Sequence, residues 1–215
     1  MPIPAFVQGN SNGDSSSGTV STCAFTSNVT AGNLLVATIG YASTSATATA
    51  SDTQGNTYST AVGPTDNTGI TYRLYTFYAV AKSSGVNTVS ITISAGSTFR
   101  RMLIHEYSGV NTLEATNSAS GNLTVPPDSG PVTTAHANAL IFGWGITNNG
   151  TTTAGTGFTL RETALSESSE DMIVSSTGTY DAIYPNDDSS WICQVAAFYY
   201  ASAATPTAVT AWLRA

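Results

Sequence analysis

The stretch Asn87–Ser94, NTVSITIS, decides the fold class. Val89, Ile91 and Ile93 point to one side of an extended chain, and the hydroxyl residues between them point to the other side. Strict alternation of apolar and polar residues is typical of a β-strand with one buried and one solvated face. The stretch therefore predicts a sheet that covers an apolar core with one face only.

A second stretch, Ala139–Thr147, is apolar on both sides of the predicted strand. Large side chains from Leu140 to Ile146 share one face, whereas the other face includes Gly143 and Gly145. Two glycines on one strand face indicate that another segment packs very close to it, or that a groove is left open there.

Similar runs recur along the chain, separated by Gly, Asn, Ser and Asp clusters. Short strands between turn residues are typical of sandwiches and barrels and not of alternating strands and helices. We expect an all-β fold, a two-sheet antiparallel β-sandwich of jelly-roll type with about a dozen strands and no internal repeat. The clearest strands are Val20–Thr26, Asn33–Tyr41, Thr71–Ala81, Thr88–Ser94, Arg100–Tyr107, Ala139–Thr147 and Trp191–Tyr200.

One domain is expected over residues 1–200, because no linker long enough to divide the chain is present. The segment Ala201–Ala215 follows the last strand and carries Val209, Trp212 and Leu213. A segment with this much apolar surface and little charge is expected to dock on its own domain or on a neighbouring copy.

The charge of the chain excludes two classes of partner. Charged residues make up 9% of the sequence, and the net charge is −7 with only 6 Lys and Arg residues. Nucleic acids and anionic membranes both attract basic surfaces, so neither is expected as a partner. No apolar run reaches the roughly 18–20 residues that span a bilayer. The start of the chain, Met1–Pro4, lacks the basic and apolar regions of a signal peptide.

Four phrases carry a resemblance: NVTAGNLLV (Asn28–Val36), SDTQGNTY (Ser51–Tyr58), EYSGV (Glu106–Val110) and ALIFGWG (Ala139–Gly145). With these phrases the chain resembles a diffuse group of uncharacterised bacterial domains of secreted and surface proteins, over roughly Ala5–Tyr200. The resemblance implies an extracellular or cell-surface β-sandwich of jelly-roll type. It implies no activity and no catalytic residues.

Two cysteines, Cys23 and Cys193, lie in the first and the last of the clear strands. Terminal strands of closed sandwiches are often neighbours, so a disulfide between these residues is one expectation. Such a bond would stabilise the fold by roughly 4–5 kcal/mol in the chain-entropy model. The alternative is that both are small buried hydrophobes that never meet.

No arrangement of residues predicts catalysis, so we expect a protein that is not an enzyme. Only His105 and His136 could act as a base, and no nucleophile motif accompanies them. Glu106 is the most suggestive acid, because it faces the apolar side of its strand and needs a partner there. We expect either a structural ion pair, with Arg100 on the same strand face, or a hydrogen bond to a turn backbone, and keep a carboxylate-pair enzyme as a remote alternative.

A carbohydrate site is the best-supported binding site in the sequence. Such a site needs an aromatic plane beside fixed polar groups. The preferred candidates are Tyr184, Asn186 and Asp187, which share one turn, together with Tyr75. The aromatic residues near strand ends or loops are Tyr41, Tyr58, Tyr72, Tyr75, Tyr184 and Trp191.

Calcium is the only cofactor for which the sequence offers ligands. Asp187 and Asp188 are weak candidates, because calcium takes oxygen ligands from acidic loops. The same residues also suit an ordinary turn that binds no metal.

We therefore expect a non-catalytic extracellular binding or adhesion module, with a polysaccharide or a cell-surface glycan as its partner. The alternative is a structural protein that assembles into a filament, capsid or virion fibre through residues 201–215. A jelly roll serves both classes, so the fold cannot choose between them.

Overall fold

The computed structural model describes residues 2–147, 150–151, 153–165, 167–186 and 190–202. Within these ranges the chain forms strands and turns, and none of it forms a helix of the length and apolar character that crossing a membrane requires. The strands are β1 (Ala5–Asp14), β2 (Gly18–Ala24), β3 (Leu34–Tyr41), β4 (Ala48–Asp52), β5 (Ser59–Asn67), β6 (Tyr72–Val80), β7 (Thr88–Ser97), β8 (Arg100–Ser108), β9 (Thr112–Gly121), β10 (Val132–Thr133), β11 (Ala139–Thr147), β12 (Thr159–Ala164), β13 (Glu167–Val174), β14 (Thr179–Tyr180) and β15 (Trp191–Tyr199).

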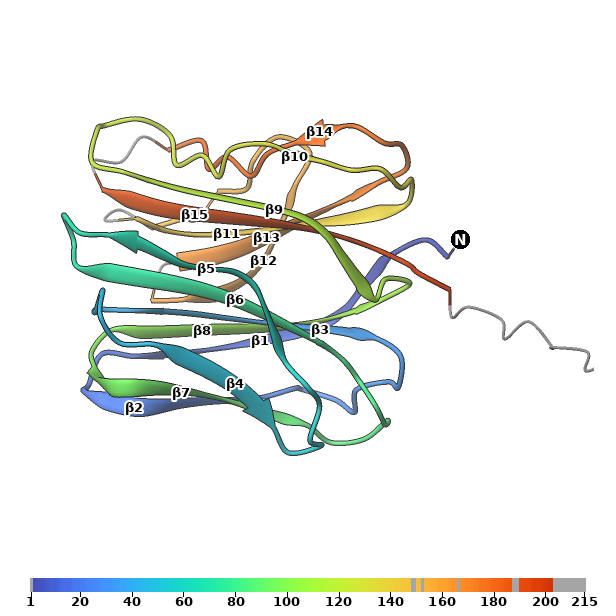
Figure 1. The fold of residues 1–215 in the computed structure, drawn as a ribbon, viewed down its shortest axis with the longest axis horizontal. Helices are drawn as coiled ribbons and strands as arrows, with labels where there is room; N and C mark the ends of the chain where they lie inside the picture. The colour runs from blue at the N-terminus through green and yellow to red at the C-terminus, as the bar shows by residue number, and fades with distance from the viewer. Residues whose placement is uncertain (1, 148–149, 152, 166, 187–189, 203–215) are drawn as a thin grey trace, which may run out of the picture.

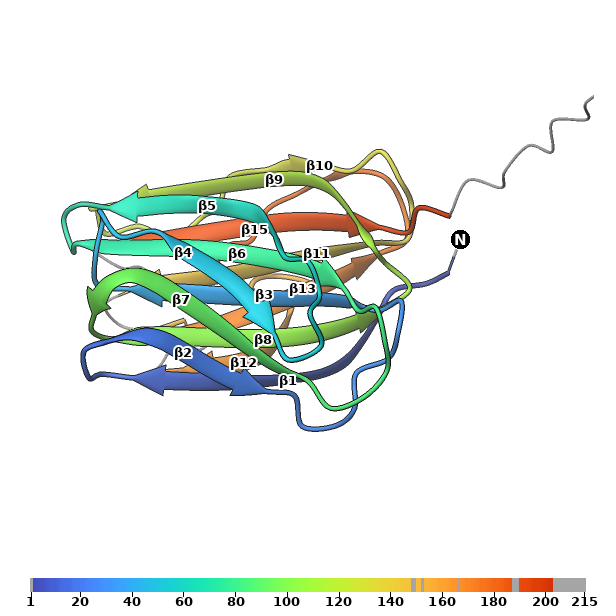
Figure 2. The ribbon, with the colours of Figure 1, turned by 60° about the horizontal axis from the view of Figure 1, so that its bottom comes forward.

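The strands form four antiparallel sheets that are stacked in layers (Figures 1 and 2). A three-stranded sheet, β2-β7-β4, covers the five-stranded sheet β1-β8-β3-β6-β5. The second five-stranded sheet, β12-β13-β11-β15-β9, lies on the other side of the first, and the ribbon β10-β14 covers it. The predicted all-β antiparallel sandwich is confirmed, and each of its two large sheets carries an additional small sheet.

The position of a strand in this stack explains its sequence pattern. Every residue of β3 and of β11 is buried, because both strands lie in sheets that are covered on both faces. In the outer strand β7, Val89, Ile91 and Ile93 are at most 1% exposed, which confirms the face predicted from alternation. The glycine face of β11 is closely packed, since a Cβ on Gly143 would lie only 2.6 Å from the Cβ of Ala182.

The chain consists of two lobes with the same strand order. We call residues 5–108 the N-lobe and residues 112–199 the C-lobe. The N-lobe sheet β1-β8-β3-β6-β5 corresponds strand for strand to β9-β15-β11-β13-β12 of the C-lobe. The N-lobe pair β2-β7 corresponds in the same way to β10-β14, while β4 has no counterpart among the described strands of the C-lobe. The N-lobe order is that of a jelly roll in which β5 lies beside β6.

The register of the strands matches as well as their order. Both β1 and β9 have ten residues, and both β8 and β15 have nine. Each ten-residue strand has a bulge at its third residue, Val7 in β1 and Glu114 in β9. Because bulges are specific irregularities of a ladder, their shared position supports the correspondence of the lobes. The expectation of no internal repeat is wrong. The repeat is present in strand order and register but not in residue identity, since β8 and β15 share no identical residue at equivalent positions.

The two lobes pack on each other through their five-stranded sheets and share an apolar core, which includes Val36 of β3 and Phe142 of β11. The polar contacts at its edges are reciprocal. Ser11 Oγ of β1 donates to Thr163 O of β12 at 2.8 Å, and Ser120 Oγ of β9 donates to Asp66 O of β5 at 2.9 Å. The edge strand β1 therefore meets β12, and its counterpart β9 meets β5, the counterpart of β12.

The predicted disulfide between Cys23 and Cys193 is wrong. Both thiols are free and buried, Cys23 in the core between the two N-lobe sheets and Cys193 in the core between the two C-lobe sheets. Both five-stranded sheets lie between these cores. Cys23 lies in β2 and Cys193 in β15, which belong to different lobes and are not neighbours, so the alternative of two buried cysteines that never meet is confirmed.

Candidate functional site

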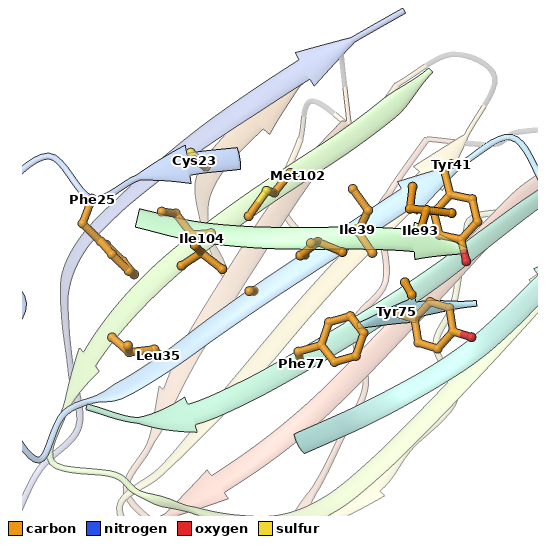
Figure 3. Packing of buried hydrophobic residues seen from close by; sticks show 14 of the residues in the cluster. Cys23, Phe25, Leu35, Ile39, Tyr41, Tyr75, Phe77, Ile93, Met102 and Ile104 are labelled. Atoms are coloured by element: carbon orange, nitrogen blue, oxygen red, sulfur yellow. The ribbon is translucent and has the colours of Figure 1, made fainter. Parts of the chain in front are cut away.

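The two aromatic residues predicted to contact a ligand are buried. Tyr184 is 1% exposed, and its hydroxyl donates to Ser168 O at 2.8 Å. Tyr75 is 5% exposed and stacks on Phe77 with ring centroids 5.4 Å apart (Figure 3). Neither ring can offer its face to a sugar, so the assignment of these residues to a binding site is wrong. Tyr184 is buried because its ring fills the space beside Gly145, which has no side chain.

The other predicted site residues are exposed or lie outside the described residues. Asn186 is exposed to solvent. Asp187 and Asp188 are not among the described residues, so the calcium site stays a prediction. Within the ranges that the structure describes, no three His, Cys, Asp or Glu side chains are grouped to hold a metal ion.

Only the start of the predicted docking segment is described. Asn111 holds Ala201 through two hydrogen bonds, from Asn111 Nδ2 to Ala201 O at 3.0 Å and from Ala201 N to Asn111 Oδ1 at 2.9 Å. Residues 203–215 lie outside the described residues, and assembly through them stays a prediction.

Glu106 is fully buried and bound within the protein. Its carboxylate accepts hydrogen bonds from Gln8 Nε2 at 2.6 Å, Asn33 Nδ2 at 2.7 Å and Thr30 N at 2.8 Å. The expected ion pair with Arg100 is wrong, whereas the other expectation, a hydrogen bond to a turn backbone, is confirmed by the bond from Thr30 N. Both residues face the small sheet of the N-lobe but lie at opposite ends of β8, and the donors that Glu106 needs come from neighbouring loops and β1 instead.

The two histidines have partners inside the protein. His105 is fully buried, and its Nε2 lies 2.7 Å from Ser169 Oγ across the lobe interface. Burial, assisted by the positive charge of Arg161, lowers the pKa of His105 to about 3, so the ring is neutral at ordinary pH. His136 stacks on Tyr199 with ring centroids 3.8 Å apart, and its Nδ1 lies 2.6 Å from Glu114 Oε1.

A pocket of about 550 Å³ opens at the end of the C-lobe where β15 begins. We call it the end pocket. Its walls come from the last part of β9, the segment before β10, the segment between β14 and β15, and the first residue of β15. The lining residues are Ala119, Val125, Pro126, Asp128, Gly130, Ile183 and Trp191.

The corresponding end of the N-lobe is filled by a guanidinium group. Arg100 is the first residue of β8, as Trp191 is the first residue of β15. The side chain of Arg100 is 4% exposed and pairs with Asp14, while its other nitrogens donate to Ser21 Oγ at 3.2 Å and to Ser16 O and Ser97 O at 2.8 Å. These bonds close the end of the N-lobe.

The C-lobe has replaced each part of this ionic closure. Asp14 is the last residue of β1, and its equivalent at the end of β9 is Gly121, against which the Trp191 ring packs. The equivalent of Ser21 is Asp128. The equivalence follows from two matching hydrogen bonds: Asn10 donates to Ala24 O in the N-lobe, and Asn117 donates to Pro131 O in the C-lobe. Ser21 lies three residues before Ala24, and Asp128 lies three residues before Pro131.

Two polar groups at the end pocket lack a hydrogen-bond partner among the described residues. Trp191 is 7% exposed, and its buried indole N–H has no hydrogen-bond partner in the described part of the chain. Asp128 Oδ1 accepts from Gly130 N at 2.7 Å, and this turn contact leaves Oδ2 without a partner among the described residues. The indole N–H is closed off against Gly121, so Asp128 Oδ2 is the one of the two groups that a ligand in the pocket can reach.

Sequence reasoning included Trp191 among the aromatic residues near strand ends but preferred Tyr184, because polar residues flank Tyr184 in the sequence. Asp128 carried no signal of its own. The alignment of the two lobes identifies both residues, but that alignment depends on strand pairing and not on residue identity.

Comparison with other proteins adds no assignment. No protein-family model, no curated protein and no solved structure matches this chain. The resemblance to bacterial surface domains therefore stays a prediction.

Proposed function

We propose that this protein is a non-catalytic extracellular binding module that takes a saccharide in the end pocket. The observation that carries the proposal is the composition of the pocket. Its walls are largely apolar and include the Trp191 ring, and they carry one carboxylate oxygen without a partner among the described residues. Saccharides present C–H faces and hydroxyl groups together, and a pocket of this kind complements both.

Two features of the geometry support this proposal. The volume of about 550 Å³ lies in the range of ligand pockets, roughly 300–1,000 Å³. Val125 at the rim is 42% exposed, and the neighbouring Leu123 is 74% exposed, so the pocket adjoins an apolar surface on which further sugar rings can lie.

The proposal assigns no catalytic step to the chain. Glu106 and His105, the acid and the base that the sequence made most suggestive, are fully buried and hydrogen-bonded inside the N-lobe and at the lobe interface. Neither lines the end pocket.

The test uses the full chain on a glycan array, followed by calorimetry with the glycans that bind. Ala119→Leu places a larger side chain in the pocket and should weaken binding at least tenfold. Ala115→Leu is the matched control, because Ala115 shares the strand and face of Ala119 but does not line the pocket. Equal binding by both variants would show that the binding site lies elsewhere. An array without any bound glycan would overturn the proposal.

A further inference from the structure

We infer that the end pocket selects ligands that carry a protonated amine, which makes amino sugars its preferred saccharides. The inference rests on the proposed function for the saccharide part of the ligand. Its own basis is the comparison of the two lobes at this end of the fold.

In the N-lobe, this position holds a cation that belongs to the chain. The guanidinium of Arg100 fills the end of the lobe and is neutralised by Asp14. In the C-lobe, the cation has been replaced by Trp191, but a carboxylate is still present, contributed by Asp128 at the position of Ser21. The C-lobe thus provides an anion and an aromatic ring around an open volume, without a cation of its own.

The other cations of the described chain are engaged elsewhere. Arg73 pairs with Asp66, Arg161 with Asp171 and Arg101 with Tyr72 and Phe99 O, while Lys82 Nζ donates to Gly55 O at 2.6 Å. None of these side chains lines the end pocket. Within the described residues, the charge of Asp128 is therefore not neutralised by the protein.

An ammonium group matches this environment in three ways. It can donate to Asp128 Oδ2, and charge-assisted hydrogen bonds are about twice as strong as neutral ones. The apolar walls lower the local dielectric constant and so strengthen the attraction. The net charge of −7 attracts cations to the protein as a whole. The ring of Trp191 lines the pocket and is left to pack against the C–H groups of the sugar.

The test compares three oligosaccharides of equal length by calorimetry at about pH 5.5. The probes are β-1,4-linked glucosamine, N-acetylglucosamine and glucose oligomers. We expect the glucosamine oligomer, which is protonated at this pH, to bind at least tenfold more tightly than the two neutral oligomers. Equal binding of all three would overturn the inference and leave the saccharide proposal standing.

Asp128→Asn isolates the charge, because an asparagine oxygen can still accept from Gly130 N and preserve the turn. This variant should lose the preference for glucosamine and bind all three oligomers alike. Asp181→Asn is the matched control, since Asp181 is exposed and outside the pocket but contributes the same charge to the whole protein. A loss of preference in both variants would show long-range attraction only and would overturn the site.

A second probe pair separates the two proposals. Cyclohexylammonium and cyclohexanol share a six-membered ring and differ in charge, and their binding is followed by NMR shifts of the Trp191 indole N–H. If no saccharide binds but cyclohexylammonium binds more tightly than cyclohexanol in an Asp128-dependent way, the saccharide proposal fails and the amine selectivity holds. Equal binding of the two probes, or no binding of either, overturns the amine selectivity.

Discussion

The N-lobe and the C-lobe share a strand order and a register but differ where their small sheets meet the large ones. The N-lobe has a three-stranded outer sheet and an end closed by Arg100, whereas the C-lobe has a two-stranded ribbon and an open pocket above Trp191. The difference shows how one strand order can leave a pocket at the end of one lobe and close the same end of the other. The strands keep their pairing, and a few side chains at one end decide whether the interior is closed or accessible.

The largest effect is expected from removing the closure of the N-lobe. Arg100→Ala should lower the free energy of unfolding by roughly 4 kcal/mol, because Ser97 O and Ser21 Oγ lose their charged donor in a buried place. Urea denaturation followed by tryptophan fluorescence measures the change. Asp14→Asn is the control, and it should cost much less because the Asp14 side chain is 42% exposed and an asparagine oxygen can still accept from Arg100. A loss below 1 kcal/mol for Arg100→Ala would show that this end of the N-lobe needs no closure.

The interiors of the lobes also differ at the equivalent residues Phe77 and Glu170. Phe77 lies opposite Ala37 in the N-lobe, and Glu170 lies opposite Gly143 in the C-lobe. Burial raises the pKa of Glu170 to about 7, although the hydrogen bond from Gly155 N opposes the shift. The folded state therefore holds this proton more tightly than the unfolded state does, and stability falls as the pH rises from about 4.5 through 7.

Glu170→Gln removes this titration and should stabilise the protein by about 3 kcal/mol at about pH 8. The gain should disappear below about pH 4.5, where the carboxyl is protonated in both states. Urea titrations at the two pH values measure it. The same gain at both pH values would show that packing, and not the charge, causes the effect.

His105 gives the N-lobe the opposite response to pH. Its folded pKa of about 3 lies below the usual value near 6.5, so the unfolded state binds the proton more readily and stability is lost as the pH falls below about 6.5. Between about pH 7 and 4.5, the free energy of unfolding should fall by roughly 2.5 kcal/mol less in His105→Gln than in the parent protein. Thermal unfolding of the parent and the variant at both pH values measures it. An unchanged pH dependence would mean that His105 is protonated in the fold.

How much of this could be predicted from the sequence depends on how local the signal is. The alternation of Val89, Ile91 and Ile93 is local, and it correctly predicted a strand with one buried face. The glycines of β11 correctly indicated a close approach, but the segment that approaches, around Ala182, could not be identified because the pairing is long-range.

The candidate site was harder to predict for the same reason. Tyr184 looked exposed because polar residues surround it in the sequence, whereas its ring enters the space left by Gly145. Trp191 and Asp128 lie 63 residues apart and meet only after β15 has paired with β9. Their roles become visible when the C-lobe is compared with the N-lobe, and few residue identities mark that correspondence in the sequence.

The smallest effect tests the correspondence itself. Asn10 and Asn117 are sixth in their strands, and each side chain donates to the neighbouring outer segment, at 2.8 Å to Ala24 O and at 2.9 Å to Pro131 O. Each also accepts from the backbone N–H of the following serine at 2.8 Å. If the lobes are equivalent here, Asn10→Ala and Asn117→Ala should each cost about 1 kcal/mol in urea denaturation. Because the two sites lie in different lobes, the double variant should lose the sum. A loss of stability in only one of the two single variants would mean that the same geometry stabilises one lobe and not the other.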